Sequence, residues 1–282
     1  SHMNRSRKLA YSLGNLAASL TYNAFFTYVN FFYVDTLKLP AGLFALGFTL
    51  YTIWNAINDP LAGALSDRTR TRWGRRIPYI ALGSLPLAVF FGLVWLAPFR
   101  GDDPRLFGYF LIIIFLFDTF YTFVTLNLVA LFPEMYPSLA ERAEVSGYRQ
   151  IFGLVGLVLG IALPPILYGS IGWGPMGLLF GLVSAICLYV SLWGSRERAG
   201  FQRDEPLPLK EALLGTLSNR SFDSFVVSYI LVQYAFSLIM AAIPFYAKYV
   251  LHLAAQDTSF LLLATILVAF PMLSFWGRVA VR

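Results

Sequence analysis

Two acidic residues stand inside strongly apolar stretches of this chain, and their position is the first indication of chemistry. Asp59 follows Asn55 and Asn58 at helical spacing within one apolar segment, and Asp118 lies within another. A carboxylate in an apolar span is costly to bury without a partner, so it marks a functional site by default. Such groups bind a proton, a cation or a polar solute; the alternative for Asp118 is pairing with a tyrosine or a backbone group.

The composition indicates an all-α, polytopic membrane protein. The chain has 282 residues, of which 58% are hydrophobic and 13% are charged, whereas about a quarter of the residues of a soluble domain are charged. Several apolar runs reach about 20 residues, the length that spans a bilayer as a helix. We predict membrane spans over residues 9–37, 41–65, 77–97, 106–132, 148–171, 175–193, 222–250 and 258–275.

The charged residues lie mainly between these spans and indicate the topology. Basic residues gather before the first span and in alternate loops, above all in the loop that carries Arg68, Arg70, Arg72, Arg75 and Arg76. Because basic loops remain on the cytoplasmic side, we expect a cytoplasmic N-terminus. The net charge of +6 therefore reflects topology. The expected partners are membrane lipid and a small-molecule solute, not nucleic acid, and the oligomeric state stays open.

Neither a cofactor nor an enzymatic reaction is expected. Cys187 is the only cysteine and lies in an apolar run, so we predict no disulfide and no cysteine-based metal site. The spans show no nucleophile–base pair and no cluster of metal-ligating residues. Na⁺ at Asp59 is the one metal ion that the sequence leaves open.

Uncharged polar side chains recur at helical spacing in two of the spans. Asn15, Ser19 and Tyr22 do so in the first span, and Thr122 and Thr125 do so in the fourth. Stripes of this kind on converging helices predict a water-filled cavity. The alternative is hydrogen bonding between helices, which Ser, Thr and Asn often supply.

The fifth span carries one arginine and a row of glycines. Arg149 either marks the membrane boundary or reaches inward to a solute or a carboxylate. Gly153, Gly156 and Gly160 recur at the spacing of small residues, and this spacing predicts close packing against a neighbouring helix.

A charged cluster follows the second span. Asp67 and Arg68 come at its end, and Arg75 and Arg76 follow Gly74. These residues either anchor the topology or form a latch of ion pairs between helices at a cytoplasmic gate. A latch of this kind holds one of two rigid-body states. We favour the latch over the topology anchor.

Several segments together carry a family resemblance. They are KLAYSLGN, FFYVDTLKLP, WNAINDP, TRTRWGRRIPYI, Tyr121-Thr122 and the YRQ around Arg149. In combination they resemble the glycoside–pentoside–hexuronide:cation symporters, the melibiose-permease-like family of the major facilitator superfamily, from Lys8 to the end of the chain. The superfamily loop pattern, glycine then Asp-Arg then Gly-Arg-Arg, lies at residues 63–76.

The resemblance implies a fold and a domain organisation. Members of this superfamily consist of two related six-helix bundles. Residues 4–194 are therefore expected to form the N-terminal bundle, and residues 221–282 the first two helices of a C-terminal bundle, so that the chain looks truncated. Residues 195–220 are expected to form a cytoplasmic linker with a short amphipathic helix over 210–217. Ser1-His2-Met3 looks like a cloning scar.

The resemblance also implies a site. The implied coupling-cation site consists of Asn55, Asn58, Asp59 and Thr122. The family pattern has an aspartate at the position of Asn55, and we hypothesise that Asp118, one turn before Thr122, replaces that charge. The expected solute site consists of Asn15, Ser19, Tyr22, Thr125 and Arg149. Ser19 and Thr125 align with sugar-binding carboxylates of the family, and Arg149 is retained.

The expected function is secondary active transport by alternating access. It would couple the symport of a small polar solute, a sugar or glycoside, to H⁺ or Na⁺, in a bacterial inner membrane. The alternative within transport is the uptake of lysolipid. The alternative outside transport is a membrane receptor or assembly subunit that moves no solute.

Overall fold

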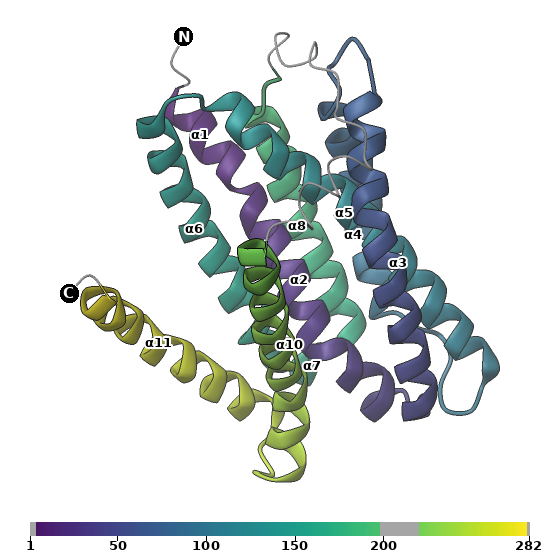
Figure 1. The fold of residues 1–282 in the computed structure, drawn as a ribbon. Helices are drawn as coiled ribbons and strands as arrows, with labels where there is room; N and C mark the ends of the chain where they lie inside the picture. Colours follow the sequence, from purple (N-terminus) through teal and green to yellow (C-terminus); the bar gives the residue numbers. More distant parts are fainter. Residues whose placement is uncertain (1–3, 198–219, 281–282) are drawn as a thin grey trace.

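The computed structural model describes residues 4–197 and 220–280, and all the regular elements in these two ranges are helices (Figure 1). Along the chain they are α1 (Arg5–Ser12), α2 (Gly14–Asn30), the π-helix η1 (Phe31–Thr36), α3 (Ala41–Arg68), α4 (Ile77–Val94), α5 (Pro104–Met135), α6 (Leu139–Ile161), α7 (Pro164–Ser170), α8 (Trp173–Gly194), α10 (Arg220–Tyr249) and α11 (Ala255–Ala280). The predicted linker helix over 210–217 and residues 1–3 lie outside the described residues. The predicted all-helical architecture is confirmed.

Most of the described helices suit a membrane by length and composition. Five segments are long and apolar enough to cross one: Ile77–Val94, Pro104–Met135, Leu139–Ser170, Trp173–Gly194 and Asp223–Tyr249. A shorter apolar stretch, Ala255–Ala269, lies in α11. The helices α1, α2 and η1 follow one another over residues 5–36, and α3 has 28 residues. Helices therefore occupy every predicted span.

The fifth span begins earlier than the sequence pattern predicts. We expected it to start at residue 148, but α6 starts at Leu139. Ser138 caps this helix, because its hydroxyl accepts a hydrogen bond from the backbone N–H of Glu141 (3.3 Å). The first turns of α6 are charged, and for this reason hydropathy alone missed them. Arg142 consequently lies within the helix and not in a loop, and Arg149 lies in the interior of the helix.

Helices α1 to α8 pack into one bundle around α2. Helix α2 packs against α6 and α8, α4 packs against α8 and α5, and α5 packs against α3 (Figure 1). Large aromatic side chains fill the core, and Phe25, Tyr28, Tyr33, Phe91 and Trp95 are each at most 2% exposed. The bundle is therefore a packed body on which polar residues can be held in place.

The contact between α2 and α6 depends on two glycines. A Cβ on Gly156 would lie 2.5 Å from the carbonyl oxygen of Leu16, and one on Gly160 would lie 2.8 Å from that of Leu20. Real side chains do not approach backbone atoms so closely, so only glycine permits this separation of the two helices. The prediction that these positions serve close packing is confirmed.

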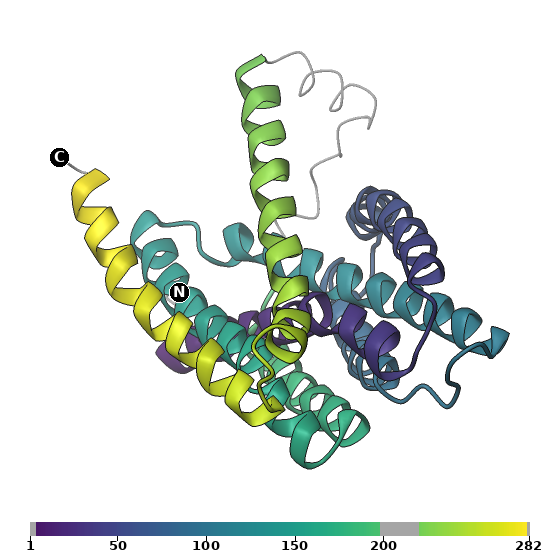
Figure 2. The same ribbon diagram turned by 90° about the horizontal axis from the view of Figure 1, so that it is seen from below.

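Helices α10 and α11 lie beside this bundle. Figure 2 shows α10 projecting from it, while α11 lies along the α6 and α7 side. Ile161, Ala162 and Leu262 form a small apolar cluster between α6 and α11. The hydroxyl of Ser259 accepts a hydrogen bond from the backbone N–H of Ile166 (2.9 Å).

The end of α10 is held by a buried carboxylate that no pattern in the sequence indicated. Asp35 lies in η1, and its side chain is 5% exposed. It pairs with the Nζ of Lys248 (2.5 Å) and accepts a hydrogen bond from the hydroxyl of Tyr249. Helical turns of the π type are rare and often occur at functional sites. Here the π-helix carries the polar link between the bundle and α10.

We expect Gly156→Ala to lower the melting temperature of the protein, because the added methyl group would collide with the backbone of α2. Overpacking of this kind costs about 1–3 kcal/mol. Gly147→Ala is the matched control on the same helix, since a Cβ there meets no atom within 4 Å. The control should be neutral or slightly stabilising, because alanine favours a helix over glycine by up to about 1 kcal/mol. Equal melting temperatures for the two variants would contradict this account.

Candidate functional site

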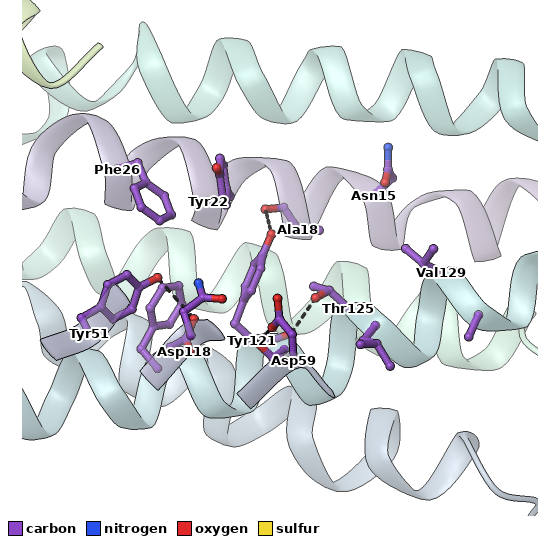
Figure 3. A pocket seen from close by; sticks show the side chains of 15 residues that line it. Asn15, Ala18, Tyr22, Phe26, Tyr51, Asp59, Asp118, Tyr121, Thr125 and Val129 are labelled. Carbon is purple, nitrogen blue, oxygen red and sulfur yellow. Dashed lines mark hydrogen bonds between the residues drawn. The ribbon is translucent and has the colours of Figure 1, made fainter. Parts of the chain in front are cut away.

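A cavity of about 670 Å³ lies between α2, α3 and α5 (Figure 3). Its polar lining consists of Asn15, Tyr22, Tyr51, Asn55, Asp59, Asp118, Tyr121, Thr122 and Thr125. Figure 3 shows Tyr121 of α5 reaching across to α2, where its hydroxyl donates a hydrogen bond to the carbonyl of Ala18 (3.3 Å). Polar residues of three helices therefore line one cavity, which is large enough for water or a small sugar.

Asp59 faces this cavity from α3. Its carboxylate accepts a hydrogen bond from the hydroxyl of Thr122 on α5 (3.1 Å). Although Asp59 belongs to an apolar span of the sequence, its side chain is exposed and lines the cavity. The reason is that α3 buries only one stripe, which includes Tyr51 and Asn58, and Asp59 lies at the edge of that stripe.

Asp118 is the buried carboxylate of the site, with 2% of its surface exposed. One oxygen accepts a hydrogen bond from the hydroxyl of Tyr51 (3.2 Å), and the other accepts one from the side-chain amide of Asn58 (3.2 Å). The same amide also lies 3.3 Å from the Asp118 carbonyl oxygen. Tyr51 was not predicted as a site residue, although its place two turns before Asn58 puts both residues on one face of α3.

Two oxygen atoms of residues near Asp59 in α3 lack a hydrogen-bond donor that they would ordinarily have. The buried side-chain oxygen of Asn58 has no hydrogen-bond partner. Pro60 lies inside α3 and lacks an N–H, so the carbonyl of Ala56 loses its helical donor. Among the described residues, no lysine or arginine forms an ion pair with Asp59 or Asp118. Oxygens of this kind suit a monovalent cation or a proton.

The expected solute residues divide into two groups. The side chains of Asn15 and Ser19 donate hydrogen bonds to the carbonyls of Arg149 (2.7 Å) and Gly153 (2.8 Å), so both join α2 to α6. Thr125 donates to the carbonyl of Tyr121 on its own helix (2.7 Å). Asn15 and Thr125 still line the cavity. Asn15 and Ser19 therefore form hydrogen bonds between helices. Their role in binding solute stays a prediction.

Arg149 and Tyr22 stand at the borders of the site. The guanidinium of Arg149 lies 4.7 Å from the centre of the Phe132 ring, and the residue borders a small recess next to Asn15 and Thr125. Tyr22 lines the main cavity and also a second one of about 450 Å³ between α2 and α10. Ser19 and Gln233 line that second cavity as well. The two cavities thus meet along one face of α2.

Charged residues join the end of α3, the α3–α4 loop and the end of α5. Glu134 is the hub, because it pairs with Arg75 (2.7 Å) and with Arg76 (3.0 Å) while its side chain is only 6% exposed. Arg76 also pairs with Asp67 (3.0 Å). Arg68 is exposed, and no ion pair joins it to this cluster among the described residues. Its place in the predicted latch stays a prediction.

A second acidic residue completes the cluster from the segment after α8. Glu197 accepts hydrogen bonds from the backbone N–H groups of Arg75 (2.9 Å) and Arg76 (3.1 Å). A Cβ on Gly74 would lie 2.1 Å from this carboxylate, and the φ of Gly74 is +108°. Only glycine meets both conditions. Neither Glu134 nor Glu197 carried a signal in the sequence, because both are distant in the chain from the arginines they bind.

The sequence matches a known family over nearly its whole length. Residues 10–282 match the family described as MFS/sugar transport protein. The chain therefore belongs to this family, and the resemblance to glycoside–pentoside–hexuronide:cation symporters is confirmed. The family is one of transport proteins, as expected for a chain with no predicted enzymatic site.

Individual relatives are symporters and transporters. An uncharacterized symporter of Synechocystis is 35% identical over 67% of this chain and 36% of its own length. The isoprimeverose transporter of Lactiplantibacillus pentosus is 28% identical over 74% of this chain and 45% of its own. A sodium-dependent lysophosphatidylcholine symporter of Gallus gallus is 24% identical over 95% and 58%, respectively. The chain spans about half the length of these relatives.

We expect Glu134→Gln to destabilise the protein strongly, because it leaves the two guanidinium groups of Arg75 and Arg76 largely buried without their shared charge. Breaking a buried ion pair by removing one partner costs about 3–5 kcal/mol. Thermal unfolding in detergent measures the loss.

Asp103→Asn provides the control, since it breaks the more exposed pair with Arg105 and should leave the melting temperature unchanged. If Glu134→Gln and the control had the same melting temperature, the charged cluster would have no role in stability.

Proposed function

We propose that the protein is a secondary active transporter that couples the movement of a small polar solute, a sugar or glycoside, to H⁺ or Na⁺. The observation that carries this proposal is the joint exposure of Asp59 and burial of Asp118 at one cavity of about 670 Å³. A volume of this size lies within the range of small-molecule sites. Membership of the MFS/sugar transport protein family supports the same function.

In this proposal Asp59 carries the coupling ion. Thr122 donates a hydrogen bond to the carboxylate, and the oxygens of Asn58 and Ala56 are proposed as further ligands from α3. Asn55 lines the same cavity one turn away. A carboxylate without a cationic partner is neutralised when it takes up a proton or a monovalent cation. Ion binding would then lower the cost of closing the cavity, which is the step that couples ion to solute.

Asn15, Tyr22 and Thr125 are proposed to face the solute, with Arg149 at the edge of its path and Ser19 on the side toward α10. Alternating access would move α10 relative to the bundle around this space. The charged cluster of Asp67, Arg75 and Arg76 is proposed as the gate on the cytoplasmic side. The N-terminus lies on that side in this arrangement, because both regions are basic, and the membrane is the bacterial inner membrane.

Counterflow in proteoliposomes tests the proposed function. Vesicles are preloaded with one of a panel of unlabelled pentosides, hexosides or lysophosphatidylcholine, and entry of the labelled compound is measured. Accumulation with a sugar or glycoside supports the proposal. Accumulation with lysophosphatidylcholine alone would show that the solute is a lysolipid and not a sugar. No accumulation with any compound would favour a receptor or assembly role.

We expect Asp59→Asn to abolish uptake against a gradient while counterflow persists, because the amide cannot change charge with an ion. Asp102→Asn, in an exposed loop, is the matched control and should retain both activities. Uptake driven by a Na⁺ gradient and by a pH gradient is measured separately, which also identifies the coupling ion. Gradient-driven uptake by Asp59→Asn at the control rate would contradict the role of Asp59.

We expect Asp118→Asn to abolish coupled uptake as well, if Asp118 supplies the charge that Asn55 lacks. Asp59 and Asp118 line the same cavity, and Asn58, the neighbour of Asp59 in α3, donates to Asp118 (3.2 Å). In this proposal the two carboxylates together bind the coupling H⁺ or Na⁺. Unchanged cation dependence in Asp118→Asn would reduce Asp118 to a structural partner of Tyr51.

A further inference from the structure

An apolar groove of about 400 Å³ runs along the outside of the bundle, away from the proposed transport cavity. It lies between the end of α3, the start of α4 and the middle of α5. Its walls include Tyr79, Leu82 and Phe123, and Tyr79 stacks on Phe123 with a centroid distance of 5.4 Å. The hydroxyls of Thr69 and Tyr79 bind each other (2.6 Å). The polar atoms in the groove are thus satisfied, and its open surface is hydrocarbon.

The position of the groove along the helices fits one membrane leaflet. Its α4 wall runs from Pro78 to Gly83, immediately after the α3–α4 loop. A helix rises about 1.5 Å per residue, so this wall descends roughly 8 Å below the loop. Leu82 is 71% exposed, so the groove is open along its side. An extended hydrocarbon chain entering from the leaflet beside the loop would have this depth and this access.

Three arginines stand at the loop end of the groove. Arg68, Arg70 and Arg72 are exposed and form no ion pair among the described residues, whereas Arg75 and Arg76 are held by Glu134. Thr69, which lines the groove, lies between the first two in the chain.

An aromatic side chain marks the same level. Trp73 is 56% exposed beside these arginines, and the Arg72 guanidinium lies 5.1 Å from its ring. Tryptophan is enriched at the level of lipid headgroups.

We propose that this groove and the three arginines form a binding site for an anionic phospholipid. One acyl chain lies along Leu82 and Phe123, and the phosphate is bound by Arg68, Arg70 and Arg72. The charge complementarity selects an anionic headgroup, and the apolar walls select a lipid over a soluble anion. The site is separate from the transport cavity and does not depend on the proposed function. Topology alone explains basic residues in this loop, but it does not explain an apolar groove that ends at them.

Native mass spectrometry of the delipidated protein tests the site, with phosphatidylglycerol and phosphatidylcholine of identical acyl chains as probes. Phosphatidylglycerol should bind more tightly, and each of R68Q, R70Q and R72Q should weaken it about fivefold, the effect of about 1 kcal/mol per basic residue. R196Q is the control, because Arg196 is exposed at the same end of the bundle. Equal binding of the two lipids, or equal losses in R196Q, would overturn the proposal.

A second pair of variants tests the groove itself. Leu82→Asn places an amide in the groove and should weaken the binding of phosphatidylglycerol severalfold. Leu85→Asn, also exposed on α4 but not lining the groove, should have no effect. Both side chains are exposed, so neither change disturbs the core, and melting temperatures confirm that the variants are folded. If the arginine variants lost binding while Leu82→Asn retained it, attraction would be purely electrostatic and the groove site would be wrong.

Discussion

The cost of placing carboxylates inside an apolar helical bundle is the constraint on which the rest of this structure depends. Asp118 is tolerated because Tyr51 and Asn58 of α3 donate to both of its oxygens. Asp59 is tolerated because it opens onto a cavity and accepts from Thr122. Both sets of contacts join α3 to α5. The same bonds that stabilise the charges therefore fix the relative position of the two helices, so the site is also part of the framework.

The remaining framework holds the bundle rigid on the other sides of the cavity. Gly156 and Gly160 bring α6 close to α2, and side chains of α2 bond to the α6 backbone there. At one end of the bundle, Glu134 and Glu197 bind the arginines of the α3–α4 loop. By contrast, α10 is held at its end by Asp35 and is otherwise largely exposed. A packed bundle beside a helix held mainly at one end supports the proposed alternating access, in which rigid bodies move relative to each other.

Much of the polar architecture could be predicted from the sequence, and the exceptions share a physical cause. Two observed contacts join residues that the sequence motifs had already indicated. They are the hydrogen bond of Thr122 to Asp59 and the ion pair of Arg76 with Asp67. Glu134, Glu197 and Lys248 were missed, because their partners lie far away in the chain and no local spacing connects them. Arg68 forms no ion pair with the cluster among the described residues, although it is adjacent to Asp67, because neighbours in sequence at a helix end point in different directions.

The sequence by itself determined the class of protein, the helices and their order, because hydropathy and helix-ending residues act locally and the bilayer thickness sets the length of a span. It also determined the family, through motifs that lie within single segments. Only the tertiary structure decided which polar side chain meets which. Helix packing sets the rotation of α3 against α5, and this rotation buries Asn58 while it exposes its neighbour Asp59 to the cavity. Which of the two residues is buried depends on contacts between distant segments, and these contacts leave no local pattern in the sequence.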